Sequence, residues 1–123
     1  MSGVHRALGA EGEERAARYL TRRGYRILAR NVRADGVEID LVVGRAGTVA
    51  FVEVKTRRSR THGAGEEAVD SRKRARLARG AAAWLREHGR FARRVRFDVI
   101  VCEPAANDAL RIRHLAGAFD ANG

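Results

Sequence analysis

The chain has 123 residues, enough for one hydrophobic core and too few for two, so we expect a single domain over residues 1–123 with its core at about 9–119 and flexible termini. With 45% hydrophobic and 33% charged residues, the composition predicts a globular protein whose surface carries many charges. The formal net charge of +10 favours a polyanionic partner, nucleic acid first and an anionic membrane surface second.

The sequence lacks the marks of an exported or membrane-spanning protein. No apolar run reaches the length of a membrane span, and the N-terminal residues do not form a signal peptide. Cys102 is the only cysteine, which excludes an intramolecular disulfide and a cysteine-rich zinc site. We therefore expect a soluble, cytoplasmic protein that binds nucleic acid and no membrane.

Hydrophobic periodicity predicts an alternation of helices and strands along the chain. A helix is expected over about 10–23, followed by a weakly alternating strand over 25–32 and a turn at Asp35-Gly36. Two strong strands over 37–43 and 48–56 form a hairpin through residues 44–47, and a basic, glycine-containing loop over 57–65 follows. A longer helix over 66–88, a strong strand over 95–102 and a short edge strand over 110–115 complete the chain. This order predicts an α/β fold in which helices flank a small sheet.

Charged residues interrupt the two central strands. Glu38 and Asp40 lie two residues apart in the first strand, as do Glu53 and Lys55 in the second, so each pair shares one face of its strand. All four stand in runs otherwise built of apolar residues. Carboxylates that converge in a sheet repel one another unless a cation neutralises them, and hard divalent cations prefer oxygen ligands. The pattern therefore predicts a metal site with a lysine beside it.

Each predicted helix also carries one charged residue on its apolar stripe. Glu13 falls on the stripe that contains Ala16 and Leu20, and Lys73 lies between Val69 and Leu77 at i−4 and i+4. A carboxylate aimed inward needs a partner or a metal, because burying it alone is unfavourable. A snorkelling side chain at the edge of the stripe is the alternative for Glu13.

An aspartate on one strand followed by Glu-x-Lys on the next resembles the signature of the PD-(D/E)XK nucleases, the restriction-endonuclease-like superfamily. The residues around this signature resemble, more specifically, the YraN-like family of predicted endonucleases, which are similar to archaeal Holliday-junction resolvases. The resemblance spans about residues 9–119 and rests on these segments in order: Gly9-x-x-Gly12-Glu13, Tyr19-Leu20, Arg30-Asn31, Glu38-Ile39-Asp40-Leu41, Phe51-Val52-Glu53-Val54-Lys55-Thr56-Arg57, Lys73 and Arg96-Phe97-Asp98-Val99.

The resemblance implies a restriction-endonuclease-like fold with a central mixed sheet of four or five strands, in the order α-β-β-β-α-β. It implies that Asp40 and Glu53 are metal-binding carboxylates, that Lys55 is the catalytic lysine and that Glu13 is the helix-borne glutamate. Val37 departs from the family, which usually has glycine directly before Glu-Ile-Asp.

The favoured hypothesis is metal-dependent hydrolysis of DNA phosphodiester bonds, with structured or branched DNA among the candidate substrates. Asp40, Glu53 and Glu13 would hold Mg²⁺ or Mn²⁺, with Glu38 farther along the strand as a ligand of a second metal or a supporting group. Lys55 would position or deprotonate the attacking water. Nucleic-acid contacts are expected from the basic loop and from the arginine ridge of the second helix: Arg57, Arg58, Arg60, Arg72, Lys73, Arg76 and Arg79. Cleavage of two strands would require a homodimer.

Two other hypotheses stay open. A non-catalytic nucleic-acid-binding module on a nuclease-like fold would account for the charge without any chemistry. A structural or interaction protein would use the acidic residues as ion-pair partners for its many arginines, and removing Asp40 or Glu53 would then destabilise the fold. Asp98 is expected to have a structural hydrogen-bonding role, and the four histidines lack the spacing of metal ligands.

Overall fold

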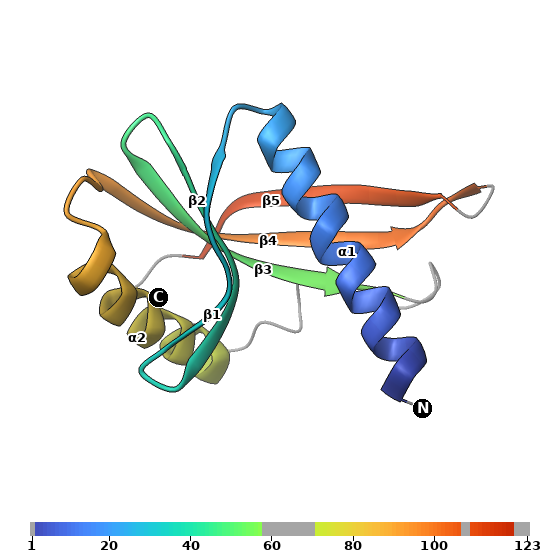
Figure 1. Ribbon diagram of the computed structural model, residues 1–123, viewed down its shortest axis with the longest axis horizontal. Coiled ribbons are helices and arrows are strands. Elements are labelled where there is room, and N and C mark those ends of the chain that lie inside the picture. Colours follow the sequence, from blue (N-terminus) through green and yellow to red (C-terminus); the bar gives the residue numbers. More distant parts are fainter. Residues whose placement is uncertain (1, 58–70, 107–108, 120–123) are drawn as a thin grey trace.

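The computed structural model describes residues 2–57, 71–106 and 109–119, with side chains from residue 9 onward (Figure 1). Its elements follow the order α-β-β-β-α-β-β and form the restriction-endonuclease-like α/β fold that the sequence predicts. They are α1 (Ser2–Arg22), β1 (Arg26–Ala34), β2 (Val37–Arg45), β3 (Thr48–Thr56), α2 (Ser71–His88), β4 (Arg94–Pro104) and β5 (Leu110–Phe119).

The five strands form one mixed sheet in which sequential strands are neighbours, in the order β1-β2-β3-β4-β5. The pairs β1–β2, β2–β3 and β4–β5 are antiparallel, whereas β3 and β4 run parallel. A parallel pair needs a crossover connection, and α2 supplies it between β3 and β4.

Both antiparallel hairpins at the start of the sheet close through two-residue turns. Asp35 and Gly36 have φ values of 50° and 74°, and Ala46 and Gly47 have φ values of 51° and 83°. Positive φ at both central residues is the geometry of a type I′ turn, whose twist matches that of the flanking strands. The hairpin predicted through residues 44–47 is confirmed.

The two helices cover opposite faces of the sheet (Figure 1). Ala16, Ala17 and Leu20 of α1 pack on one face, where the strands contribute Leu41, Val43, Ala50, Val52, Ile100 and Cys102. Leu77, Ala81 and Trp84 of α2 pack on the other, where the strands contribute Val37, Ile39, Val42, Val49, Phe51, Phe97, Val99 and Val101. Because successive strand residues point to opposite faces, each strand feeds both cores.

Helix α2 lies very close to β2 at one point. A Cβ atom on Gly80 would lie 2.8 Å from the Cβ atom of Val37, so only glycine allows this approach. Val37 itself is buried in the core under α2. The valine that departs from the family pattern therefore fills a packing position opposite a glycine.

Several elements are longer than predicted, and the largest extensions are those of α1 and β5. Helix α1 begins at Ser2, and β5 continues to Phe119, where the ring stacks on Phe97 with centroids 5.0 Å apart. The register between β4 and β5 shifts between Phe97 and Val99. Because of this bulge-like irregularity, β5 stays paired with β4 beyond residue 115, its predicted end. Residues 58–70 and 120–123, which contain most of the predicted basic loop and the C-terminal tail, lie outside the described residues. Among the helices that are described, neither is long and apolar enough to cross a membrane.

Candidate active site

The candidate site lies where β2 and β3 separate. The two strands pair from Arg45↔Thr48 up to Leu41↔Val52, and toward its beginning β2 continues paired only with β1. The regular alternation of β2 side chains between the two faces of the sheet is also broken here. Ile39 and Val42 both belong to the core under α2, although residues three apart in a regular strand point to opposite faces. Asp40 therefore stands at the fork of the sheet, and Glu53 is the next residue of β3 beyond the last pair.

Asp40 fills the gap that the separating strands leave. Its Oδ2 accepts a hydrogen bond of 2.8 Å from the backbone N–H of Val54, so a side chain replaces the missing ladder acceptor. The pKa of the Asp40 carboxyl is raised to about 7, first by burial and then by the negative charges of Glu53, Glu13 and Glu38, although the hydrogen bond from the Val54 N–H lowers it. The other three predicted carboxylates thus all act electrostatically on Asp40.

Glu53 is held between two lysines. Its Oε2 lies 2.8 Å from Lys73 Nζ and 3.4 Å from Lys55 Nζ. Burial lowers the pKa of Lys55, and its neighbour Lys73 lowers it further. For Lys73, burial acts in the same direction, but the hydrogen bond to Glu53 together with the contact to Lys55 and the charges of Glu53 and Asp40 outweighs it, so its pKa is raised. Of the two amines, Lys55 is therefore the one whose proton is more easily lost.

A pocket of about 470 Å³ opens over these residues. Its walls are Val37, Glu38, Asp40 and Glu53 from the strands and Arg72, Lys73, Arg76 and Leu77 from α2. Carboxylates thus face guanidinium and ammonium groups across one hollow, a charge distribution suited to an anion that is bound together with a cation. Glu38 lines this pocket and is exposed. The sequence predicts it as a ligand of a second metal or a supporting group, not as a main ligand.

Glu13 reaches the site because α1 lies against the end of β3. At Gly12 an added Cβ would clash with the Thr56 hydroxyl, and the Gly12 carbonyl accepts a hydrogen bond from Cys102 Sγ at 3.5 Å. Glycine at this position lets the helix backbone approach the sheet. The next residue, Glu13, is half-buried and raises the pKa of Asp40. The stripe position of Glu13 therefore brings a third carboxylate close enough to Asp40 to raise its pKa.

The predicted nucleic-acid residues divide into three groups. Arg72, Lys73 and Arg76 line the pocket. Arg57 and Arg79 are ion-paired elsewhere, Arg57 with Glu103 at 3.7 Å and Arg79 with Asp35 at 3.0 Å. Arg58 and Arg60 lie outside the described residues.

The donor atoms at this site suit a hard divalent cation, although the side chains do not form a compact ligand set. Within residues 2–57, 71–106 and 109–119, no three His, Cys, Asp or Glu side chains lie together as a ready metal-binding cluster. Asp40 and Glu53 nevertheless face one pocket, and the negative charges of Glu53, Glu13 and Glu38 add to burial in raising the pKa of Asp40. A bound cation would relieve that repulsion, so the residues fit Mg²⁺ or Mn²⁺.

Sequence reasoning missed a buried glutamate beyond the pocket. Glu103 accepts ion pairs from Arg57, Arg111 and Arg113, at 3.7, 3.1 and 3.7 Å. Strand pairing brings these groups together, because Arg111 lies opposite Glu103 on β5 and Arg113 lies opposite Val101. In the sequence, Arg111 and Arg113 are two basic residues of a predicted edge strand, and nothing local indicates that Glu103 on β4 is their partner.

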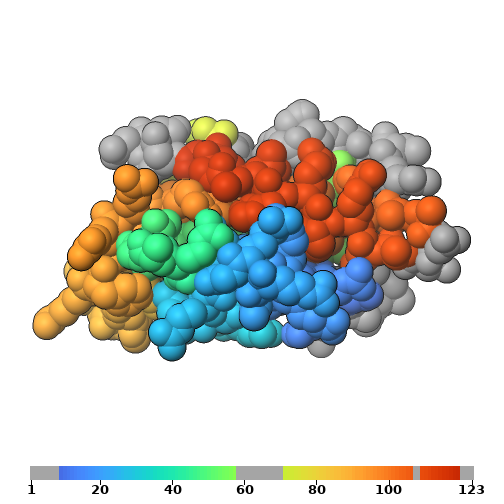
Figure 2. Space-filling model, turned by 90° about the horizontal axis from the view of Figure 1, so that it is seen from above, coloured from blue at the N-terminus to red at the C-terminus, as the bar shows by residue number. Residues whose placement is uncertain are grey.

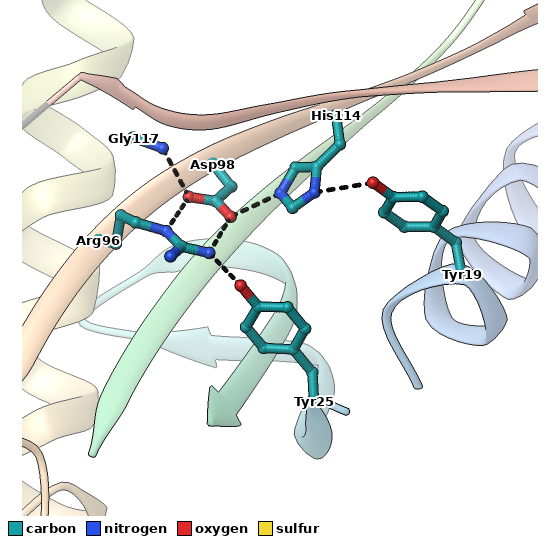
Figure 3. A network of polar contacts seen from close by, with 6 residues as sticks. All are labelled: Tyr19, Tyr25, Arg96, Asp98, His114 and Gly117. Carbon is teal, nitrogen blue, oxygen red and sulfur yellow. Dashed lines mark hydrogen bonds and ion pairs between the residues drawn. The ribbon is translucent and has the colours of Figure 1, made fainter. Parts of the chain in front are cut away.

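A second polar cluster lies on the α1 face of the sheet, opposite the pocket. Asp98 is fully buried and receives hydrogen bonds from Arg96 Nε and Nη2, His114 Nε2 and the Gly117 N–H, at 2.8, 2.9, 2.8 and 3.0 Å (Figure 3). Burial alone would raise the pKa of Asp98, but these donors lower it to about 2. The expected structural role of Asp98 is confirmed, whereas the part of His114 was not foreseen.

The raised pKa of Asp40 has a consequence for stability. The folded state disfavours the ionised carboxyl, so the wild type loses stability as the pH rises from about 4 through 7. In the metal-free protein at pH 8, Asp40→Asn should therefore raise the free energy of unfolding by about 2 kcal/mol, and the gain should vanish near pH 4. Asparagine keeps an oxygen that can accept the Val54 N–H.

Urea unfolding in EDTA at the two pH values measures this effect, with Asp35→Asn at the exposed β1–β2 turn as the control. A loss of stability in Asp40→Asn at pH 8 would favour the structural ion-pair hypothesis instead.

Comparisons with known proteins agree on one family. The sequence model of a family described as uncharacterised protein family UPF0102 matches residues 12–102. A UPF0102 protein of Symbiobacterium thermophilum is 47% identical over 96% of this chain and 100% of its own length. Relatives from Trichlorobacter lovleyi and Geobacter sulfurreducens are 44% and 42% identical, over 94% of this chain and 92% and 91% of their own lengths. The matched segment contains every residue of the candidate site.

Proposed function

Because the chain belongs to the uncharacterised family UPF0102, the YraN-like family, whose name assigns no activity, we propose from the candidate site that it is a metal-dependent nuclease hydrolysing DNA phosphodiester bonds. The observation that carries this proposal is the convergence of Asp40, Glu53 and Lys55 at the fork between β2 and β3. Acidic and basic groups line one pocket there, which suits a phosphate that is bound and polarised at once.

The cations of α2 would hold the substrate. Arg72 and Arg76 stand on the wall opposite the carboxylates, and their planar forks match the paired oxygens of a phosphodiester. Lys73 is kept protonated by Glu53, so it would act as a fixed positive charge near the phosphate. These three residues supply binding and charge stabilisation rather than proton transfer.

Lys55 would serve the attacking water. Burial and the neighbouring Lys73 lower its pKa, so Lys55 gives up a proton more readily than an exposed lysine does. A neutral amine can accept a proton from water, and the protonated amine can then donate toward charge developing on the phosphate. Glu53, 3.4 Å from its Nζ, fixes the position of the amine.

Asp40 and Glu53, with Glu13 beside them, would hold Mg²⁺ or Mn²⁺. The ion, when bound, supplies Lewis acidity at the phosphate and lowers the pKa of water. Neutralising these carboxylates would also bring Asp40 into its ionised form at neutral pH, because its pKa is raised by burial and by like charges.

Incubation of plasmid, linear duplex and branched DNA with Mg²⁺ or Mn²⁺ tests the proposal. Cleavage that depends on the metal and is abolished by EDTA is the expected result. Absence of cleavage of every substrate with either metal would contradict it.

The rival function, a nucleic-acid-binding module without chemistry, has one observation in its favour. Two lysines already neutralise Glu53 without any metal. Mg²⁺ or Mn²⁺ titration by calorimetry separates the two functions. We expect heat from the wild type that is lost in Asp40→Asn and kept in Asp35→Asn. A wild type that binds DNA but gives the same signal as Asp40→Asn would favour the binding module.

A further inference from the structure

Arginines gather on the α1 side of the molecule, across the sheet from the carboxylate pocket. Figure 2 looks onto the surface where the C-terminal part of α1, the β2–β3 turn and β5 come together. A pocket of about 520 Å³ opens here between α1 and β5. Its lining residues are Arg15, Arg18, Tyr19, Arg22, Arg23 and Ile112.

A second pocket, of about 530 Å³, lies at the β2–β3 turn and the start of β4. Tyr25, Arg45, Arg93, Arg94 and Arg96 are among the residues that line it. The two pockets are in contact, because Arg45 of the second donates a 2.7 Å hydrogen bond to the backbone carbonyl of Arg23 in the first. The two pockets therefore adjoin, and we call their lining residues together the arginine face.

The arginine face holds positive charge that the described residues leave largely uncompensated. The side chains of Arg22, Arg93 and Arg94 form no ion pair with any carboxylate in the described part of the chain. Of the other lining arginines, Arg18 lies 3.6 Å from Glu14, and that carboxylate is shared with Arg30. No acidic residue is part of either lining.

A buried network links the two pockets and fixes their aromatic walls (Figure 3). Tyr19 of the first pocket contacts His114 Nδ1 at 3.2 Å, and Arg96 donates to the Tyr25 hydroxyl of the second at 2.6 Å. His114 and Arg96 both bind Asp98, whose four acceptor positions are filled. The Asp98 carboxylate only accepts, so His114 donates from Nε2 and can accept the Tyr19 hydroxyl at Nδ1. Such locked side chains pre-organise a binding surface.

We propose that the arginine face binds the phosphate backbone of a nucleic acid, as a second binding surface separate from the carboxylate pocket. The nature of the ligand rests on the proposed function, whereas the existence of an anion-binding surface rests on the geometry alone. Arginine guanidinium groups bind phosphate oxygens in pairs, and the aromatic rings beside them can stack on bases. Binding to an anionic membrane also uses exposed apolar side chains, and the exposed large hydrophobics among the described residues, Phe91 and Val95, line neither of these two pockets. Phe91 lines an adjoining pocket that shares Arg45 with the second, so the test below includes vesicles.

Binding measurements in a cleavage-deficient background isolate this surface. In Asp40→Asn protein with EDTA, fluorescence anisotropy follows a labelled duplex over a range of salt concentrations. Arg18→Gln/Arg22→Gln tests the first pocket, and Arg93→Gln/Arg94→Gln tests the second. The matched control is Arg86→Gln/Arg90→Gln, which removes the same charge from exposed positions in the last turn of α2 and just beyond it, outside both pockets.

We expect each pocket variant to lose on the order of tenfold in affinity at moderate salt and about two units of the log–log salt slope. The control should lose no more than about twofold. Equal losses in the control and in the pocket variants would overturn the proposal, since they would reflect net charge alone. The proposal would also fail if the pocket variants lost binding to phosphatidylserine vesicles while retaining full affinity for DNA.

This test does not depend on the chemistry of the carboxylate pocket. If the wild type cleaves no DNA but the pocket variants lose affinity, the arginine face stands and the nuclease proposal fails. If the wild type cleaves DNA, and the same arginine substitutions placed in the wild-type background change neither binding nor cleavage, the nuclease proposal stands and the arginine face fails.

Discussion

Asp40→Asn and Lys55→Ala should each reduce metal-dependent DNA cleavage by at least about 10²-fold. Asp40 loses the charge that would hold the cation, and Lys55 loses the amine that would serve the attacking water. Both side chains lie at the fork of the sheet, and neither substitution removes a core residue. The initial rate of plasmid nicking at saturating Mg²⁺ or Mn²⁺ measures the effect.

Two controls separate chemistry from folding and from charge. Asp35→Asn makes the same chemical change at an exposed turn residue, where the carboxylate pairs with Arg79 3.0 Å away, and it should cleave like the wild type. Glu38→Gln, at the rim of the pocket, should retain more activity than Asp40→Asn. Wild-type rates in both Asp40→Asn and Lys55→Ala would remove the basis of the proposed mechanism.

Asp98→Ala should lower the free energy of unfolding by about 3–5 kcal/mol, the largest stability effect that we expect from a polar residue in this chain. The substitution removes the fully buried carboxylate that accepts hydrogen bonds from Arg96 and His114, so these N–H donors lose that partner. Urea unfolding at pH 7 measures the loss, with Asp35→Asn as the exposed control that should change stability by less than about 0.5 kcal/mol, because asparagine tolerates the positive φ of that turn position. A loss below about 1 kcal/mol in Asp98→Ala would contradict the structural role.

The same carboxylate should make stability depend on acid pH. Its folded pKa of about 2 lies below the ordinary value of 3.8, so its contribution is fully present well above pH 4 and is lost as the pH falls through 2. The two-unit difference corresponds to about 2–3 kcal/mol. Between pH 6 and pH 2.5, the wild type should therefore lose more stability than Asp98→Asn does. Equal losses in the two proteins would show that other groups govern the acid transition.

The strands that carry the site were predictable because their chemistry is local. Alternating apolar residues define β2 and β3, and Asp35-Gly36 and Ala46-Gly47 supply the turn geometry that joins neighbouring strands. Charged residues inside such runs are rare, which singles out Asp40, Glu53 and Lys55 directly. The same reasoning found Glu13 and Lys73, since each breaks the apolar stripe of its helix.

The exact arrangement of these residues was not predictable, because it depends on where pairing stops. Nothing in the local pattern shows that β2 leaves β3 at Asp40, or that the Asp40 side chain accepts the Val54 N–H in place of a backbone carbonyl. Nor does it show that Lys73 contacts Glu53 from a helix twenty residues away. Nor does it show that Arg57, one of the predicted nucleic-acid contacts, pairs with Glu103.

The sequence by itself determined the secondary structure, the family and the residue types of the site, because periodicity, turn chemistry and misplaced charges are properties of neighbouring residues. Only the tertiary structure decided which distant charges meet. The parallel pairing of β3 with β4 places Asp98 on the face opposite Glu53, and the shifted register of β5 brings His114 to Asp98. Packing of α1 on that face then sets Tyr19 beside His114 and its arginines around one pocket. Such contacts join residues up to 95 positions apart, and strand register, which no local pattern encodes, determines them.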